Sequence, residues 1–318
     1  MRKIISIFLF CVFIQIAQAA EKKSYYTLQF GTFPLTAQKQ ALTLYKTLKE
    51  AGHLVYYQTD SFNGKEELKV RVGIFSDRTQ TQKISKKLES PYTVEKTRLF
   101  VDHAKQFRIV TTPSAIWYDA ENSTKELYVF EGIHGADLLE QTYALLSPTG
   151  KDIIFYYDGK IIKVDVGTGK SRTLVKEGLF DSRPVWSYDG RYIAYLDNTE
   201  WETPTSLCII EAEKNHCLIK NNETTQKAVK SFQWYPGKNR LFFVEGHAYG
   251  TVSVGGSLYM VDMEGKRKDV VLQEEGKFEE IHAEFSIHEG LLSYQVVQFD
   301  KEYTKSLSST TRKIRVDN

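Results

Sequence analysis

Two segments of the sequence alternate polar and apolar residues and could together present one polar surface. These segments are residues 26–33 and 68–75. Because successive side chains of a strand point to opposite faces, each segment predicts a strand with one apolar face and one polar face. The polar positions are Thr27, Gln29, Gly31, Lys69, Arg71 and Gly73. Amide and guanidinium groups on such a face can bind hydroxyl, acetamide and carboxylate groups, and the two cations make the face positively charged.

Catalytic and metal-binding motifs are absent from the sequence. None of the seven histidines forms an H-E-x-x-H motif, and no Gly-x-Ser-x-Gly elbow occurs. His282, Glu284 and His288 could meet in space, but their place in a strand-turn segment favours a structural or exposed role. The sequence therefore predicts no catalytic residue, no metal site and no cofactor.

The two polar segments belong to a unit that is repeated at an offset of 42 residues. The matched pairs are Leu28 with Val70, Phe30 with Val72, Gly31 with Gly73, Phe33 with Phe75, Gln38 with Gln80, Gln40 with Gln82, and Leu42 with Ile84. In each copy an alternating strand ends at Gly-x-Phe and a helical stretch follows. One strand-then-helix unit is therefore written twice.

The two expected helices differ in how strongly the sequence specifies them. The apolar positions of the first helix are Ala37, Ala41, Leu44, Leu48 and Ala51. They recur at steps of three and four, and Gly52 supplies a C-terminal stop. Asp77 is the expected N-cap of the second helix, whose large apolar residues are Ile84 and Leu88.

Two further strands complete a small N-terminal domain. Residues 53–59 and 92–95 are typical of strands, and residues 62–64 are typical of a hairpin turn. The resulting order is strand, helix, strand, strand, helix, strand (βαββαβ). This order predicts an α+β, ferredoxin-like domain whose antiparallel sheet has both helices on one side and an open, shallow polar groove on the other.

The repeated pattern over Tyr25 to Arg98 resembles the SPOR domain. That family binds peptidoglycan glycan strands in the bacterial periplasm and prefers strands stripped of stem peptides, which occur where cells divide. The resemblance implies that the open face binds glycan. The implied glycan-binding residues are Thr27, Gln29, Gly31, Phe33, Lys69, Arg71, Gly73 and Phe75. The two phenylalanines could equally pack under the helices, and Thr32 and Ile74 stand where family members often have Ser or Pro between Gly and Phe.

RNA-recognition modules use the same order of elements and stack bases on aromatic residues of the central strands. Here the open face has no aromatic residue on its inner strands. The sequence therefore predicts no nucleic-acid partner.

The N-terminus has the pattern of a cleaved signal peptide over residues 1–19. Arg2 and Lys3 precede an apolar run, residues 4–16, and Ala17-Gln18-Ala19 is a small-x-small cleavage site. The run is short for a bilayer span, so we predict a periplasmic protein with no stable membrane span; a permanent anchor is the alternative. Cys11 follows Phe10, not a small residue, which argues against lipidation there.

Charge divides the mature chain into two unlike parts. Residues 25–98 hold 12 Lys and Arg against 7 Asp and Glu, a net +5, whereas residues 99–318 hold 26 against 32, a net −6. A basic small domain beside an acidic larger region suggests different partners for each.

The C-terminal region contains four loosely similar stretches. Their anchors are Leu146, Trp186, Trp234 and Phe285. Spacings of 40, 48 and 51 residues suit four-stranded propeller blades with variable loops. The stretch PVWSYDGRYIAY, residues 184–195, resembles the repeat of TolB-type propellers. The resemblance implies an all-β region over residues 145–318, a TolB-like β-propeller of four to five blades. Residues 99–144 are either its first blade, which would complete the ring, or a connecting segment beside an open or unusually small propeller.

Cys208 and Cys217 lie on two short strands joined by a polar turn. In an oxidising compartment this arrangement favours a disulfide, although two separate buried thiols remain open as an alternative.

Together these features predict a non-catalytic periplasmic protein. Its SPOR-like domain would bind glycan strands, and its propeller would serve as a scaffold for envelope or division proteins. The alternative is a cell-wall hydrolase, or an activator of one, that the small domain localises.

Overall fold

The structure is a computed structural model. The residues that it describes are 21–62, 65–85, 91–104, 106–121, 123–176, 179, 182–200, 202–249, 255–272, 278–302 and 304–316. The predicted signal peptide, the centre of the predicted turn at residues 62–64 and Leu88 lie outside the described residues. No helix within the described ranges combines the length and apolarity needed to cross a bilayer.

The first elements follow the order strand, helix, strand, strand, helix, strand. They are β1 (Glu21–Pro34), a short 3₁₀ turn (Leu35–Ala37), α1 (Gln38–Glu50), β2 (Val55–Phe62), β3 (Lys65–Phe75), α2 (Arg78–Ser85) and β4 (Thr93–His103). The strands are antiparallel and lie side by side in the order β2-β3-β1-β4. Both helices contact β1 and β3.

Local sequence sets the ends and the buried side of the two helices. Ala41, Tyr45 and Leu48 of α1 pack into the core that the sheet supplies on this side. Gly52, at φ +83°, ends α1 in the left-handed conformation that glycine adopts without strain. At the start of α2, Asp77 Oδ1 accepts hydrogen bonds from the backbone N–H groups at positions 79 and 80, as expected for an N-cap.

The sheet of the small domain continues into the next part of the chain. β4 pairs with β1 at its start and with β5 (Phe107–Thr111) at its end, and β6 (Ala115–Ala120) and β7 (Ser123–Val129) follow. The result is one seven-stranded sheet in the order β2-β3-β1-β4-β5-β6-β7. Residues 93–95 pair with β1 alone, as predicted for an edge strand, but β4 continues to His103 and pairs with β5 over residues 100–103, so the predicted boundary at residue 98 falls inside β4. The sequence alone does not show that this strand continues and pairs with a second neighbour.

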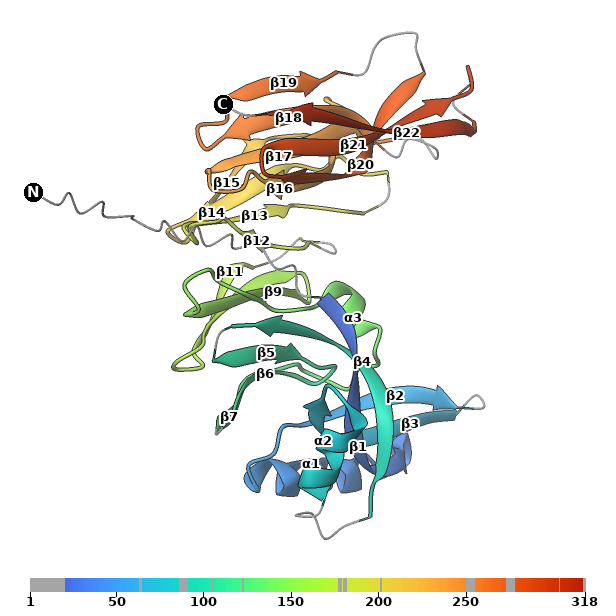
Figure 1. The fold of residues 1–318 in the computed structure, drawn as a ribbon, viewed down its shortest axis with the longest axis vertical. Helices are drawn as coiled ribbons and strands as arrows, with labels where there is room; N and C mark the ends of the chain where they lie inside the picture. Colours follow the sequence, from blue (N-terminus) through green and yellow to red (C-terminus); the bar gives the residue numbers. More distant parts are fainter. Residues whose placement is uncertain are drawn as a thin grey trace, which may run out of the picture.

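The remaining strands form three further sheets. A short helix, α3 (Leu138–Gln141), precedes them. The strands are β8 (Leu145–Leu146), β9 (Asp152–Tyr157), β10 (Lys160–Asp165), β11 (Ser171–Val175), β12 (Val185–Trp186), β13 (Tyr192–Leu196), β14 (Leu207–Glu211), β15 (Lys214–Ile219), β16 (Lys227–Trp234), β17 (Arg240–His247), β18 (Gly255–Asp262), β19 (Arg267–Val271), β20 (Glu279–His288), β21 (Leu291–Phe299) and β22 (Ser306–Arg315). The sheets are β11-β10-β9-β8, β12-β13-β14-β15 and β16-β17-β18-β20-β21-β22, with β19 paired to β18. In Figure 1 the sheets follow chain order, from the small domain at the bottom to β18–β22 at the top.

Successive sheets bury apolar side chains against each other on both faces. Ile153 and Phe155 of β9 pack against β5, β6 and β7, whereas their neighbours Ile154 and Tyr156 pack against β13 and β14. Because both faces are covered, these strands are apolar at nearly every position and lack the alternation of a half-exposed strand.

The repeated anchors have a structural reason at two of their four positions. Trp186 Nε1 donates to the backbone carbonyl of Leu145 at 3.1 Å, and Trp234 Nε1 donates to that of Val185 at 3.2 Å. Each indole therefore ties the first strand of its sheet to the first strand of the preceding sheet.

Cys208 and Cys217 lie opposite each other in the register of β14 and β15, and a disulfide joins them. The bond therefore closes the hairpin that the sequence suggested.

Candidate ligand-binding face of the small domain

Four of the predicted site residues meet on the sheet face that the helices leave uncovered. Gln29 on β1 lies opposite Arg71 on β3, so their side chains project to the same side. Arg71 Nε donates to Gln29 Oε1 at 3.4 Å. Thr27 and Lys69 extend the same face along β1 and β3. The structure therefore brings these polar residues together.

Asp60, on the edge strand β2, contacts both cations of this face and was not among the predicted site residues. Its Oδ2 lies 2.9 Å from Lys69 Nζ and 3.4 Å from Arg71 Nη2. Its Oδ1 accepts a hydrogen bond from Gln58 Nε2 at 2.8 Å. The signal for Asp60 was present in the sequence, because residues 56, 58 and 60 share a face in a strand with a period of two. The strand was expected to end at residue 59, which left Asp60 out.

The polar face is only partly accessible, which corrects the expectation of an open groove. Thr27 and Arg71 are buried, with 0% and 5% of their surface exposed. Thr27 Oγ1 donates to the carbonyl of Val72 at 3.2 Å, and Arg71 Nη1 lies 3.5 Å from Thr97 Oγ1. Gln29, Lys69 and Asp60 remain partly exposed.

The cover comes from the sheet that continues beyond β4. At one end this face is apolar, and Tyr25, Tyr56 and Ile74 pack there against Trp117 of β6 and Leu139 of α3. Because an edge strand was expected here, the sequence did not predict that β6 and α3 would cover the apolar end of this face.

The face is also balanced in charge, whereas a cationic surface was expected. Over residues 25–29 of β1 and the strand segments beside them, the register places three cations on the described part of the face, Lys65, Lys69 and Arg71, and Lys23 follows on the same side opposite Leu99. Three carboxylates, Asp60, Glu67 and Glu95, lie on the same side. The net charge of +5 in this region therefore does not gather on the polar face.

The other four predicted site residues form two equivalent packing contacts. A Cβ atom on Gly31 would lie 2.4 Å from the ring of Phe33, and one on Gly73 would lie 2.4 Å from the ring of Phe75. In each copy the ring therefore occupies the space over the glycine two residues earlier. Phe75 is buried in the helix-side core, and Phe33 packs against the same core. Phe75 is not available to lie against a ligand on the polar face, and the repeated Gly-x-Phe is explained by packing.

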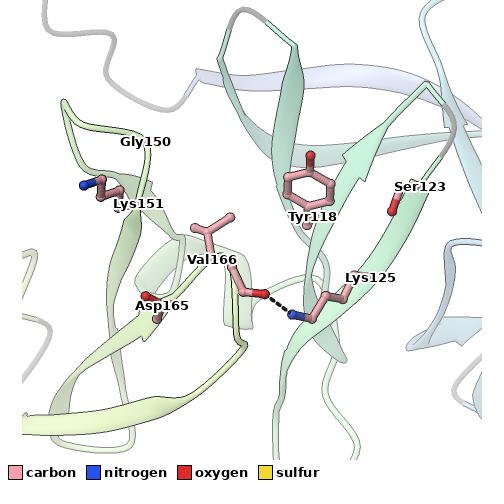
Figure 2. Close-up of a pocket in the computed structure, with 8 residues that line it drawn as sticks. Tyr118, Ser123, Lys125, Gly150, Lys151, Asp165 and Val166 are labelled. Atoms are coloured by element: carbon pink, nitrogen blue, oxygen red, sulfur yellow. Dashed lines mark hydrogen bonds between the residues drawn. The ribbon is translucent and has the colours of Figure 1, made fainter.

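Two surface cavities lie outside the polar face. One, of about 510 Å³, opens between the hairpin of β6 and β7 and the turns of the next sheet. In Figure 2, Tyr118, Ser123 and Lys125 lie on one side of it and Lys151 and Asp165 on the other. Lys125 Nζ donates to the carbonyl of Gly167 at 2.8 Å, so this ammonium holds the two sheets together.

The second cavity, of about 560 Å³, lies where the end of β3 and the loop before β2 meet β5 and the hairpin of β6 and β7. His53, His103 and Arg108 are among its lining residues. Burial lowers the pKa of both histidines, and the charges of Arg108 and Lys23 lower the pKa of His103 further. Both imidazoles are therefore neutral at pH 7. Arg108 bridges the two parts, since it binds Asp119 at 2.7 Å and the carbonyl of Ile74 at 2.9 Å.

One group of described residues has the side-chain spacing of a metal site. It comprises Asp197, Cys208 and Cys217. Since the two sulfurs are joined in a disulfide, they offer no thiolate for a metal ion.

Family models match two parts of the chain. The SPOR domain model matches residues 22–94, which confirms the resemblance inferred for this region from the sequence. Residues 198–312 match the model of a domain of unknown function, DUF4652. None of the curated proteins compared with the chain matches it.

Solved structures similar to the chain include two TolB proteins. A protein assigned as TolB from Agrobacterium tumefaciens is 13% identical, with 78% of this chain and 88% of that chain covered and a TM-score of 0.37. TolB from Acinetobacter baumannii is 12% identical, with 85% and 69% covered and a TM-score of 0.39. A protein assigned as a conserved lipoprotein of Clostridium novyi NT is 21% identical, with 42% and 86% covered and a TM-score of 0.37.

Proposed function

We propose that the protein is a non-catalytic binding protein of the bacterial periplasm. Its SPOR domain holds peptidoglycan glycan strands, and its stacked sheets present a surface to other envelope proteins. The observation that carries this proposal is the match of residues 22–94 to the SPOR domain, a family that binds peptidoglycan. The partly exposed polar side chains on the helix-free face of this domain supply suitable ligand-binding groups.

The chemistry of the accessible side chains suits a glycan. Gln29 is held in place by two hydrogen bonds. Its Nε2 donates to Thr32 Oγ1 at 2.9 Å, and its Oε1 accepts from Arg71 Nε. One amide N–H and one lone pair remain, and the Lys69 ammonium has donors beyond its contact with Asp60. Hydroxyl and acetamide groups of a sugar both donate and accept, so they can use these positions.

The stacked sheets support the scaffold part of the proposal. We infer that β4–β7, β8–β11, β12–β15, β16–β19 and β20–β22 are five blades of a propeller-type scaffold. The small domain is fixed to the first of them, because Glu126 of β7 accepts hydrogen bonds from Tyr45 and Lys49 of α1. A shared strand, β4, adds to this connection. A glycan bound to the small domain would therefore have a fixed orientation relative to the scaffold.

Binding to purified sacculi tests the first part of the proposal. We expect Gln29→Ala with Lys69→Ala to reduce binding about tenfold or more, which corresponds to losing two hydrogen-bonding side chains. Arg71 is left intact because it is buried and its removal would disturb the fold. The matched control is Gln106→Ala with Lys151→Ala, which removes the same residue types at exposed positions elsewhere. If the Gln29/Lys69 variant binds like this control, the polar face is not the glycan site.

Two further measurements address location and catalysis. A fluorescent mature protein exported to the periplasm should gather at division sites, and the Gln29/Lys69 variant should spread evenly. Incubation with labelled peptidoglycan should release no soluble fragments; their appearance would favour the hydrolase alternative.

A further inference from the structure

We propose that β22 pairs with the same strand of a second copy of this chain, so that the protein forms an antiparallel dimer through its last sheet. This surface is distinct from the polar face of the small domain. The pairing does not depend on glycan binding and can be tested without a ligand.

β22 is longer than the outer strands of the other sheets. The strands at the corresponding edges are β7, β11, β15 and β19, which have 7, 5, 6 and 5 residues, whereas β22 has 10. Short edge strands limit pairing between chains, because the unpaired N–H and C=O groups of an edge are available to another strand. Within the described ranges, β22 pairs with β21 alone. Its outer edge is therefore an unusually long template for a further strand.

Packing within the chain does not require this length, because β22 lies beyond the core of its sheet. Tyr294 and Val296 on β21 are buried, whereas their partners on β22, Arg312 and Thr310, are exposed. Nine of the ten residues of β22 are exposed in all. Leu307, at 61%, is the most exposed large apolar residue in the described part of the chain. A second strand beside β22 would cover surface that the chain itself leaves open.

The charge pattern of β22 favours antiparallel pairing with itself. Residues 306–311 carry no charge, and the cations Arg312, Lys313 and Arg315 gather at one end. Parallel pairing would place equal cations side by side, about 5 Å apart. In an antiparallel pair centred near Thr310, Arg312 and Lys313 lie roughly 14 and 20 Å along the strands from their equivalents, beyond the screening length of about 8 Å at physiological salt.

The same pairing keeps each cation beside an uncharged or neutral segment. Arg312 would lie opposite Ser308 of the partner subunit, and the end of the strand would meet the partner's turn at residues 300–305, where Asp and Glu balance two lysines. Charged residues on an edge strand normally prevent pairing, but here they leave residues 306–311 uncharged. The edge is therefore protected at one end only, which selects an antiparallel partner.

A dimer of this kind would carry two small domains far from each other. In Figure 1 the small domain and β20–β22 lie at opposite ends of the stack of sheets. A dimer joined at β22 would therefore hold its two SPOR domains at its two ends, and it could bind two glycan strands at once. This consequence rests on the proposed function of the small domain, whereas the pairing of β22 does not.

Sedimentation velocity of the mature protein over a concentration series tests the dimer. Because one pair of strands buries less surface than a standard interface, we expect a weak dimer with a Kd of about 10 µM. Thr310→Lys puts two like charges at the centre of the pair and should weaken association about tenfold or more. The matched control is Thr173→Lys at an exposed position of the edge strand β11, and it should dimerise like wild type. Circular dichroism and thermal melting verify that both variants fold.

Disulfide crosslinking locates the contact. Residues that lie opposite each other in an antiparallel pair are close enough for a disulfide. Thr310→Cys should therefore give a covalent dimer under mild oxidation, whereas Thr173→Cys should not. Ser309→Cys and Thr311→Cys cover a shift of the register by one residue in either direction. The native cysteines of the mature chain are joined to each other and do not compete.

A protein that stays monomeric at every concentration would overturn the proposal. A dimer that Thr310→Lys leaves unchanged would also overturn it, because such a dimer uses another surface. Equal crosslinking of the β11 and β22 variants, or none in β22, would refute the pairing as well. If the dimer forms but does not bind sacculi, the proposed function is wrong while the pairing of β22 stands.

Discussion

The two copies of the 42-residue unit make the same contact in different surroundings. In both, a phenylalanine ring lies over the glycine two residues before it, at the same distance from the missing Cβ atom. Phe75 is 6% exposed, whereas Phe33 is half-buried. Gly73 has φ +69°, while Gly31 does not adopt a left-handed conformation. The motif thus makes the same packing contact in both copies, and we expect the second copy to depend on it more strongly.

The helices of the two copies also differ. α1 has 13 residues and buries Ala41, Tyr45 and Leu48, and its N-cap residue makes no side-chain hydrogen bond. α2 has 8 residues and begins at a capped N-terminus on Asp77. We therefore expect tertiary packing to hold the long helix and the cap to contribute more to the short one. Sequence repetition therefore preserves topology while each copy acquires its own source of stability.

Truncating the second phenylalanine should give the largest difference between the copies. Phe75→Ala should cost about 3–5 kcal/mol because it opens a cavity in the helix-side core. Phe33→Ala should cost about 1–2 kcal/mol, since that ring is already partly hydrated. Native-state amide hydrogen exchange of β1 and β3 measures both. Equal losses would show that the two rings contribute alike and that the comparison is wrong.

Adding a methyl group to each glycine sharpens the same contrast. Gly73→Ala should cost about 2–4 kcal/mol, because it combines an unfavourable positive φ with a clash against a buried ring. Gly31→Ala should cost about 1 kcal/mol or less, because the half-exposed Phe33 can turn aside. The measurement is again hydrogen exchange, with thermal melting as a second probe. A greater loss at Gly31 would contradict the assignment of strain to the second copy.

Tyr45 tests the contact between α1, in the first copy, and strand β7. Burial, followed by the hydrogen bond and the charge of Glu126, raises the pKa of Tyr45 above its ordinary value. The folded state therefore keeps the phenolic proton at pH values where the unfolded chain loses it. The resulting stability is fully present below about pH 10 and is lost as the pH rises above it.

Tyr45→Phe should lower stability by about 1.5 kcal/mol at pH 8, because a hydrogen bond to a carboxylate is removed. The difference in free energy of unfolding between wild type and variant should narrow above about pH 10. There the unfolded wild-type chain loses the Tyr45 proton, whereas the variant has no such proton to lose. Denaturant titrations at pH 8 and 10.5 measure this, and α2 offers no equivalent tyrosine. A difference in stability that does not change with pH would show that folding does not raise the pKa of Tyr45.

The sequence predicted most of the elements because their signals are local. The alternation in residues 68–75, the stop at Gly52 and the cap at Asp77 all depend on neighbours within a few positions, and the structure has each of them. The repeat anchors Trp186 and Trp234 were likewise found by their spacing, and their indole hydrogen bonds supply the reason.

What the sequence did not predict depends on contacts between distant segments. Arg71 and Thr27 are buried, and Arg71 contacts Asp60 of β2 and Thr97 of β4, which nothing in residues 26–33 or 68–75 indicates. The balance of charge on the polar face depends on Asp60, which belongs to that face because β2 continues past residue 59 and pairs with β3 as far as Phe62. Both errors concern the neighbours of a strand. The alternation of polar and apolar residues shows which side chains share a face, but it does not show which segments lie beside or above them.

The cap of α2 gives the smallest expected effect. Asp77→Ala should cost about 1 kcal/mol, because the N–H groups that Asp77 Oδ1 now satisfies would lose their acceptor. Thr36→Ala is the control in the first copy, where the helix has no side-chain cap, and it should change stability by only a few tenths of a kcal/mol. Hydrogen exchange of the α2 amides is the most direct measurement, and Asp77→Asn should restore protection because asparagine is also a strong N-cap. If α2 keeps its protection without any cap, then tertiary contacts hold it as they hold α1, and the two copies are stabilised in the same way after all.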